Sequence, residues 1–200
     1  MFVQVITGRV TDRAGLRRQH ERWQEDLRLG APGYLGTTAG VTDEGRFVVL
    51  ARFESEAAAR ANSAREEQGA WWAETEKCLE DVSFADCTKV TTLLGGGSDD
   101  AGFVQIMRGR VTDPQKMEAV EPRMGEFETA MHRIRPDILG EMIVEHGDGT
   151  YTDAVYFTSE ADARAGESQS MPDDVAGLFN EIMSAIAIDE FLDLKEPWLV

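Results

Sequence analysis

The side chain best placed to do chemistry is His20, which interrupts an apolar stripe of Leu16, Trp23 and Leu27 at helical spacing. A histidine beside a tryptophan on an inward face can act as a general base. It would take the proton of a phenol or quinol, so that the electron-rich anion meets oxygen without a cofactor. The structural alternative places His20 at the edge of the stripe, with its ring bonded to a backbone carbonyl. Glu121 stands at the matching place in a second copy of this segment.

Gln4 and Gln105 are the same residue in two nearly identical segments, Phe2–Asp12 and Phe103–Asp113. Eight of the eleven positions are identical, and both segments are apolar and β-prone on both faces. A buried amide must find hydrogen-bond partners, so each glutamine is a candidate to orient a ligand. A bridge to the neighbouring strand or to a facing sheet is the structural alternative.

Arg9 and Arg110 lie near the ends of the same two segments, just after a glycine. A guanidinium at the mouth of a pocket can hold an anionic substrate through a bidentate contact. Ion pairs with nearby carboxylates such as Asp12 and Asp113 are the alternative. Both arginines are therefore candidate substrate-binding residues.

Trp23 and the adjacent pair Trp71 and Trp72 supply flat apolar walls suited to an aromatic ligand. Core packing is the alternative, and two adjacent tryptophans cannot both face inward, so one is expected at an interface. The three histidines show no ligand spacing with cysteine or carboxylate, so no metal site is predicted. The two cysteines have no counterparts in the second copy, which predicts reduced thiols rather than a disulfide.

These residues must be positioned by a chain that repeats itself, because the similarity of the two segments continues downstream at an offset of about one hundred residues. Each copy predicts the order β-α-β-β-α-β, the ferredoxin-like pattern of an α+β protein. In the first copy the expected strands are 2–10, 34–42, 46–53 and 82–92, with helical regions 13–29 and 56–80. In the second copy they are 103–111, 138–145, 150–157 and 186–194, with helical regions 114–133 and 160–184. Pro122 and the Met171-Pro172 pair predict breaks in the second set of helices.

The repeat predicts a first unit at residues 1–94, a Gly-rich flexible linker at 95–102 and a second unit at 103–200. A single ferredoxin-like unit covers one sheet face with helices and leaves the other face apolar. We therefore predict that the two units pack sheet to sheet as an intramolecular pseudo-dimer. The chain would then be a monomer or would associate further into a homodimer.

The composition narrows the classes of function. A hydrophobic content of 42% in 200 residues predicts a folded protein with a sizeable core. The net charge of −17 disfavours nucleic acid and anionic membrane surfaces as partners. With no apolar run long enough to span a bilayer, the sequence predicts a cytoplasmic protein. Residues 99–200 carry 22 of the 37 acidic side chains, which indicates either an acidic, solvated surface or a division in which one copy binds while the other mainly solubilises the protein.

The order of elements, the Phe53-Glu-Ser-Glu-Ala57 strand-to-helix junction and the Trp71-Trp72 pair resemble the dimeric α/β-barrel superfamily. The resemblance is to its antibiotic-biosynthesis-monooxygenase-like domains, here in tandem over nearly the whole chain. It implies a small-molecule pocket between the sheet and the helices of each unit. Known members include cofactor-free quinol-forming monooxygenases, haem-degrading enzymes, isomerases and stress-response proteins, so the fold alone does not decide the activity.

The resemblance also implies residues to look for. Haem-degrading members use an asparagine on the first strand, a tryptophan on the second helix and a histidine about one helix later. This chain has Gln4 or Gln105 at the first place and Trp71 or Trp72 at the second, but no histidine from 74 to 86. Haem degradation is therefore disfavoured, although haem binding stays open.

Two hypotheses follow from the sequence. The first is a cofactor-independent monooxygenase of an aromatic substrate, with His20 as base, Gln4 as orienting amide, and Trp23 and Trp71 as walls. The second is a non-catalytic binding or stress-response protein, in which the missing asparagine and histidine, and Glu121 in place of His20, mark a lost site. Neither hypothesis identifies the ligand.

Overall fold

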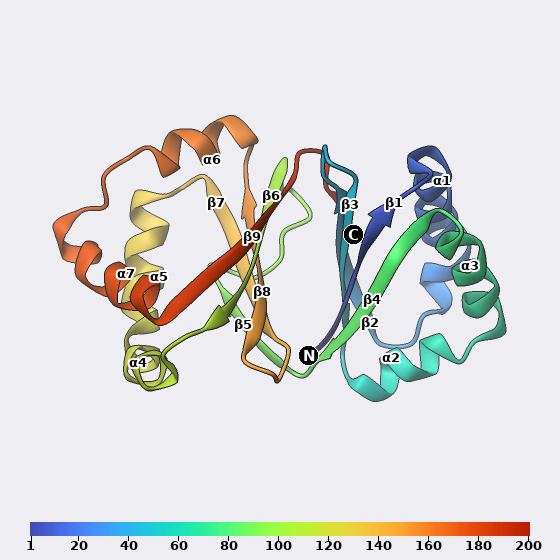
Figure 1. Cartoon of the computed structure of the whole chain (residues 1–200), viewed down its shortest axis with the longest axis horizontal. Coiled ribbons are helices and arrows are strands. Elements are labelled where there is room, and N and C mark those ends of the chain that lie inside the picture. The colour runs from blue at the N-terminus through green and yellow to red at the C-terminus, as the bar shows by residue number, and fades with distance from the viewer. The chain divides into compact units, whose positions relative to one another are not determined.

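A computed structural model describes residues 1–200 as an α+β protein of two compact units, each with one five-stranded antiparallel sheet (Figure 1). The first unit comprises residues 1–90 and 196–200, and the second comprises 91–195. In each unit the helices lie on one face of the sheet. The predicted pair of ferredoxin-like units is confirmed, whereas their sheet-to-sheet packing stays a prediction.

The elements of the first unit follow the predicted order. They are β1 Phe2–Val10, α1 Arg13–Arg22, η1 Trp23–Leu27, η2 Arg28–Gly30, β2 Tyr34–Val41, β3 Arg46–Phe53, α2 Glu56–Ser63, α3 Glu66–Glu76, β4 Leu79–Cys87 and the C-terminal β10 Trp198–Leu199. The sheet order is β10-β2-β3-β1-β4.

The second unit repeats this plan. Its elements are β5 Lys89–Leu93, β6 Phe103–Val111, α4 Pro114–Val120, η3 Glu121–Arg123, α5 Met124–Ile134, β7 Ile138–Glu145, β8 Thr150–Phe157, α6 Glu160–Glu167, α7 Asp173–Ala185 and β9 Ile186–Leu194. The sheet order is β5-β7-β8-β6-β9. The breaks at Pro122 and before Asp173 occur where the prolines predict them.

Four side chains start the main helices by accepting a hydrogen bond from a free backbone N–H of the first turn. Asp12 accepts from Gly15 and Asp113 accepts from Lys116. Ser55 and Ser159 do the same for α2 and α6. Such caps contribute about 1 kcal/mol each, and their recurrence at matching positions gives the two units the same helix starts.

The first helix is not continuous to residue 29 as predicted. It changes at Trp23 into a π-helical turn, η1, and then into the short 3-10 turn η2. The second helical region also breaks at residues 64–65 rather than near Gly69, which lies inside α3. A π turn shifts the following side chains around the helix axis and is frequent at functional sites.

The predicted strand 82–92 is in fact two strands, and the unit boundaries differ from the predicted ones for this reason. β4 ends at Cys87, and β5 joins the edge of the second sheet beside β7. The last residues of the chain likewise add β10 to the edge of the first sheet beside β2. Lys89–Leu93 and Trp198–Leu199 are therefore edge strands, one in each sheet.

Gly36 and Gly140 occupy matching positions at these two sheet edges, and both are places of close approach. A Cβ on Gly140 would lie 1.7 Å from the carbonyl oxygen of Gly96, which follows β5. A Cβ on Gly36 would lie 2.4 Å from the carbonyl oxygen of Val200, which follows β10. Because the approaching atoms belong to the backbone, only glycine allows the added strands to dock.

Each unit packs a cluster of apolar side chains between its sheet and its helices. In the first unit it includes Ile6, Leu16, Phe47 and Val49. In the second unit it includes Phe103, Met131, Ile138, Val155 and Phe157. None of the helices combines the length and the apolar character that a bilayer crossing requires.

We expect Gly140→Ala to destabilise the second unit by about 2 kcal/mol, because the methyl group must push the backbone at Gly96 and β5 away from β7. Chemical denaturation would measure the loss. Gly125→Ala is the matched control, since no atom lies within 4 Å of its Cβ inside α5. It should stabilise by about 0.5–1 kcal/mol through helix propensity. Equal effects of the two substitutions would contradict the docking role of Gly140.

Candidate functional site

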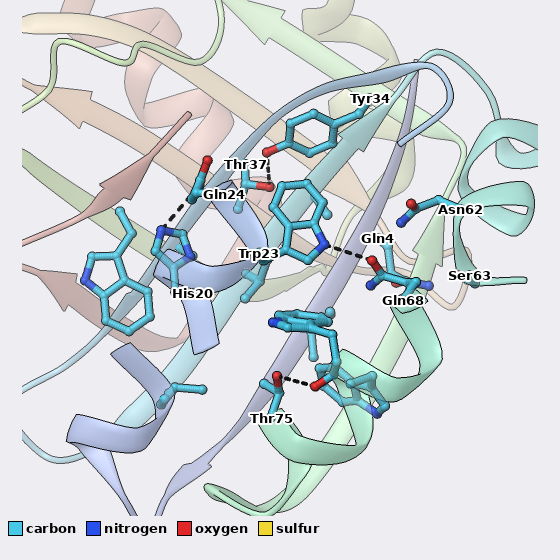
Figure 2. A pocket seen from close by; sticks show the side chains of 18 of the residues that line it. Gln4, His20, Trp23, Gln24, Tyr34, Thr37, Asn62, Ser63, Gln68 and Thr75 are labelled. Carbon is cyan, nitrogen blue, oxygen red and sulfur yellow. Dashed lines mark hydrogen bonds between the residues drawn. The ribbon is translucent and has the colours of Figure 1, made fainter. Parts of the chain in front are cut away.

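The first unit contains a cavity of about 100 Å³ between its sheet and its helices (Figure 2). Its floor is made by alternate residues of β1, β2 and β3, and its walls come from α1, η1, α2, α3 and β10. The lining residues are Gln4, Ile6, Leu16, His20, Trp23, Gln24, Tyr34, Thr37, Ala39, Phe47, Val49, Ala51, Phe53, Asn62, Ser63, Gln68, Trp71, Trp72, Thr75 and Trp198. The cavity therefore combines aromatic walls with a small number of polar groups, as ligand sites do.

Two indole N–H groups fix the tryptophan walls. Trp23 on η1 donates its Nε1–H to Oε1 of Gln68 on α3, at 2.8 Å. Trp71 on α3 donates its Nε1–H to the backbone oxygen of Gln19 on α1, also at 2.8 Å. The π turn at Trp23 and the position of α3 are thus tied together across the cavity, and the faces of both rings are left for apolar contact.

His20 lines the cavity, and none of its hydrogen bonds described here goes to a backbone carbonyl. Its Nε2 lies 3.4 Å from Nε2 of Gln24, and its ring centroid lies 4.8 Å from that of Trp198. Burial lowers the pKa of His20 to about 4, with the positive charge of Arg17 acting in the same direction and Glu21 opposing it. The imidazole is therefore neutral at physiological pH.

A second hollow of about 310 Å³ lies outside the cavity and shares His20, Gln24 and Trp198 with it. Trp198 is held in place by β10, whose neighbour Val200 exchanges backbone hydrogen bonds with Thr37 of β2. The Arg17 guanidinium lies 5.1 Å from the centroid of the Trp198 ring. The three shared side chains form the boundary between the cavity and the outer hollow, so they stand where a ligand would enter.

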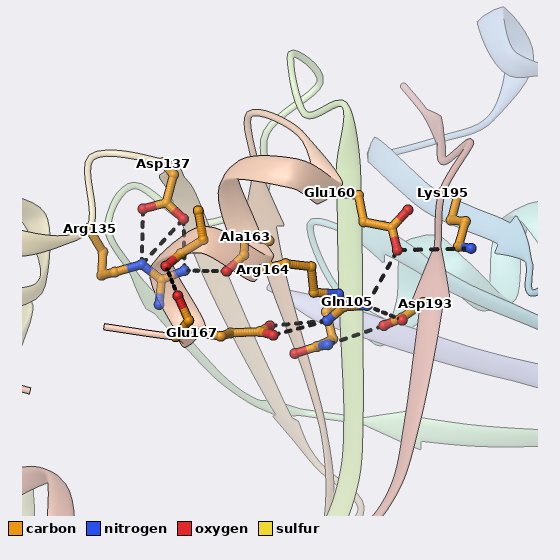
Figure 3. A network of polar contacts seen from close by, with 11 residues as sticks. Gln105, Arg135, Asp137, Glu160, Ala163, Arg164, Glu167, Asp193 and Lys195 are labelled. Atoms are coloured by element: carbon orange, nitrogen blue, oxygen red, sulfur yellow. Dashed lines mark hydrogen bonds and ion pairs between the residues drawn. The ribbon is translucent and has the colours of Figure 1, made fainter. Parts of the chain in front are cut away.

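Gln4 lines the cavity, but its amide nitrogen donates to Oδ1 of Asp86 on β4, at 3.0 Å. Gln105 in the second unit makes the same contact with Asp193 on β9, at 3.1 Å. Asp193 is also paired with Arg164 in a network of charged side chains (Figure 3). The repeated glutamine–aspartate pair shows that the amide nitrogen bridges neighbouring strands in both units.

The remaining candidates do not line the cavity. Arg9 is exposed and pairs with Glu80 at 2.9 Å, and Arg110 is exposed and pairs with Asp189. Glu121 is exposed at the start of η3 in the second unit. The structure therefore brings together His20, Gln4, Trp23 and Trp71, and places Arg9, Arg110, Gln105 and Glu121 elsewhere.

Strand register identifies the second-unit counterparts of the cavity floor. Thr37 and Val49 correspond to Glu141 and Asp153, because both pairs occupy the same places opposite their neighbouring strands. Burial raises the pKa of Glu141 to about 7, opposed by the hydrogen bond with Asp153 and reinforced by the charge of Glu128. Burial and the neighbouring Glu141 raise the pKa of Asp153 well above its usual value. The second unit thus has two carboxyl groups where the first has a threonine and a valine.

Several lining residues were not found from the sequence. Gln24 and Gln68 lie beside the predicted tryptophans, and Tyr34 donates its hydroxyl hydrogen to Oγ1 of Thr37, at 2.7 Å. The two glutamines could not be recognised as lining residues from the sequence, because polar side chains on helices usually face the solvent. The contact of Trp198 with His20 depends on β10, which the sequence does not reveal.

No group of three or more histidine, cysteine, aspartate or glutamate side chains is arranged to hold a metal ion. Cys78 and Cys87 are both buried and free. Burial raises the pKa of the Cys78 thiol, which keeps it protonated and unreactive. The chemistry available in the cavity is accordingly that of a neutral imidazole, amides, hydroxyls and indoles.

The overall fold matches solved structures over nearly the whole chain. A candidate monooxygenase from Lactobacillus acidophilus has a TM-score of 0.72 at 12% identity, covering 100% of this chain and 98% of its own. A candidate monooxygenase from Fusobacterium nucleatum has a TM-score of 0.69 at 11% identity, covering 99% and 91%. An anthrone oxidase-like protein has a TM-score of 0.63 at 11% identity, covering 100% and 91%. No family model and no curated protein matches the sequence.

These similarities confirm the predicted fold. The chain has the ferredoxin-like, two-unit architecture found in monooxygenase-like proteins, as the resemblance of its Phe53–Ala57 junction and Trp71-Trp72 pair implied. At identities of 11–12% the similarity concerns the fold, and the activity must be argued from the cavity.

We expect the first unit to lose stability as the pH falls from about 6.5 to about 4. In this range the unfolded chain binds a proton at position 20 while the folded unit does not, so protonation favours unfolding. The pKa shift corresponds to about 3 kcal/mol. Unfolding free energies of His20→Gln should vary less with pH, whereas His132→Gln, at an exposed position of α5, should behave as the parent protein does. An unchanged pH dependence in His20→Gln would contradict the burial of a neutral ring.

The second unit should show the opposite dependence. Glu141 and Asp153 are protonated when folded, so stability is complete at acid pH and is lost as the pH rises through about 7, where a buried carboxyl group must ionise. Asp153→Asn should therefore raise the Tm at pH values above 7 and change it little at acid pH. Scanning calorimetry over a pH series would measure this. Glu126→Gln, an exposed position on α5, is the control, and a similar gain there would point to general charge reduction instead.

Proposed function

We propose that the first unit binds a single-ring phenol or quinol in its cavity and oxidises it with dioxygen, without a bound cofactor. The observation that carries the proposal is the placement of a neutral His20 in the wall of a cavity otherwise built from Trp23, Trp71 and Tyr34. A neutral imidazole can accept the proton of a hydroxyl group, and indole faces suit a flat ring.

The size of the cavity limits the substrate. About 100 Å³ is somewhat less than the roughly 150 Å³ that holds a benzene molecule in a dry engineered cavity. One aromatic ring therefore fits with small adjustments of the walls, and substituents would extend past His20 and Trp198 into the outer hollow. One of the structurally similar proteins is described as anthrone oxidase-like, a name that also refers to an aromatic substrate.

Haem is a poor fit to the same space. A macrocycle of four pyrroles is several times larger than the about 100 Å³ available. The His20 ring, the one imidazole in the cavity, packs against Trp198.

The reaction can be written with the groups present. His20 accepts the phenolic proton as one electron passes from the substrate to dioxygen, giving an aryloxyl radical and superoxide. Their recombination forms a carbon–oxygen bond at the ring. Loss of the ring hydrogen and cleavage of the oxygen–oxygen bond then yield a quinone and water, with the proton returned from His20. The apolar walls favour this course because they keep water from the reactive intermediates.

A second candidate, non-catalytic binding of the same aromatic class, is favoured by the pKa of His20. A base whose conjugate acid has a pKa of about 4 is weak for removing a phenolic proton. An unactivated phenol has a pKa of about 10, so complete proton transfer before electron transfer would be unfavourable. Catalysis therefore requires an easily oxidised substrate, such as a quinol, for which proton and electron transfer occur together.

We expect phenols and quinols of one ring to bind and to quench the fluorescence of the cavity tryptophans, and Ala39→Ile to abolish this binding. The reason is that isoleucine fills the cavity floor, and the matching position of the second unit, Ile143, shows that the fold accepts it. Titration calorimetry and thermal unfolding would measure binding and folding together. Undiminished binding by a folded Ala39→Ile protein would contradict the assigned site.

Oxygen uptake separates the two candidates. His20→Gln should retain binding and lose oxygen uptake with quinols by about 100-fold or more, as expected for the loss of a general base. His132→Gln should leave uptake unchanged. Binding without uptake in the parent protein would favour the non-catalytic function.

A further inference from the structure

A row of oxidisable rings runs along the wall of the cavity. We define the ring chain as Tyr34, Trp23, Trp71 and Trp72. Successive ring centroids lie 4.9, 6.3 and 5.9 Å apart, so each ring is at or near contact with the next. Indole and phenol are the side chains most easily oxidised by one electron, and electron transfer is fast between rings at such separations.

The ring chain connects the interior with the surface of the first unit. All four rings line the cavity, and the Trp23 side chain is buried (Figure 2). Trp72 is partly exposed and packs at 5.2 Å against Phe84, which is 50% exposed on β4. An electron that leaves Trp72 can therefore reach the buried Trp23 in two steps between neighbouring rings, and Tyr34 in three.

The second unit shows that this fold does not require the ring chain. From the strand register and the helix ends, the counterparts of Tyr34 and Trp23 are Ile138 and Met124. The carbonyl oxygens of Cys78 and Ala185 accept equivalent backbone hydrogen bonds at the ends of α3 and α7. Counted back from these two residues, Trp71 and Trp72 correspond to Leu178 and Phe179. The same architecture is thus built without a single indole or phenol at these four places.

We propose that the ring chain carries single electrons from the protein surface into the cavity and so removes oxidising radicals that form there. The source of the radicals rests on the proposed function, since an aryloxyl radical that escapes recombination with superoxide adds a second dioxygen and becomes a peroxyl radical of the substrate. Electron transfer through Trp72, Trp71 and Trp23 requires only these rings and does not rest on the proposed function.

Each electron and proton in this process has a source and a destination. The peroxyl radical takes an electron from Tyr34 or Trp23 and a proton from water, and becomes a hydroperoxide. The oxidised ring takes an electron from Trp71, and Trp71 in turn takes one from Trp72. Trp72 then loses its indole proton to water and becomes a neutral indolyl radical. A thiol in solution then gives a hydrogen atom to Trp72 and becomes a thiyl radical. Trp23 and Trp71 keep their protons during transfer because their N–H groups face amide oxygens, which are not bases.

Pulse radiolysis tests the conduction directly, with azide radicals as the one-electron oxidant of exposed tryptophan. All proteins would carry Trp198→Phe, so that this indole does not contribute. The indolyl absorbance should decay while phenoxyl absorbance rises, at a rate independent of protein concentration, as Tyr34 reduces the oxidised indole. Tyr34→Phe should abolish the phenoxyl rise, and Trp71→Phe should slow it by more than an order of magnitude. Tyr151→Phe, in the second unit, is the control and should leave it unchanged.

The outcomes separate this inference from the proposed function. A phenoxyl rise that persists in Tyr34→Phe, or keeps its rate in Trp71→Phe, would overturn the ring chain whatever the protein does with quinols. Conduction without any oxygen uptake would support the ring chain and remove the proposed source of the radicals. With both present, peptide mapping after turnover should find more oxidation of Trp23 and Tyr34 in Trp72→Phe than in the parent protein, and equal oxidation would overturn the protective role.

Discussion

The first unit depends on two indole hydrogen bonds that cross between its helices in opposite directions. Trp23 donates from η1 to Gln68 on α3, and Trp71 donates from α3 to Gln19 on α1. A buried N–H without a partner costs more than the bond gains, so both rings are held in one orientation. With their edges fixed, the rings stand as walls and do not collapse onto the sheet. The cavity and the burial of His20 follow from this arrangement.

Much of the architecture could be predicted from the sequence because its signals are local. The repeated Phe2–Asp12 segment, the capping residues Asp12 and Asp113 and the break at Pro122 act over a few residues. The strands β5 and β10 could not be predicted in the same way. Their pairing is decided by a close backbone approach at Gly140 and Gly36, which are distant in sequence, and a glycine in a strand is compatible with several other roles.

The candidate site was predicted in part for the same reason. The helical spacing of Leu16, Trp23 and Leu27 placed His20 on an inward face, and it does line the cavity. The spacing could not show that Trp198 would cover the ring and lower its pKa, because that contact depends on β10. The amides of Gln4 and Gln105 were candidates to orient a ligand, but each bridges to an aspartate on a neighbouring strand. A repeated polar residue in a buried strand therefore marks a structural bridge as readily as a ligand contact.

The buried carboxyl pair escaped prediction because acidic residues that alternate along a strand normally face water. Glu141 and Asp153 instead face the helices, and their raised pKa values keep them protonated. His20 in the first unit is kept unprotonated by burial. One scaffold thus holds a neutral base in one copy and neutral acids in the other, and as the pH falls from about 6.5 to about 4 the first unit loses stability while the second unit gains it.

The internal repeat gives a physical means of separating what the fold needs from what the site needs. Both units keep the capping residues, the edge glycines and the glutamine–aspartate bridge, so these features belong to the fold. Only the first unit combines His20 with indoles at the matching positions around a cavity. Core packing alone would be served by the aliphatic and phenyl side chains that the second unit uses there, and three indoles add N–H groups that must each be satisfied. The aromatic composition of the first unit is therefore not a requirement of the fold.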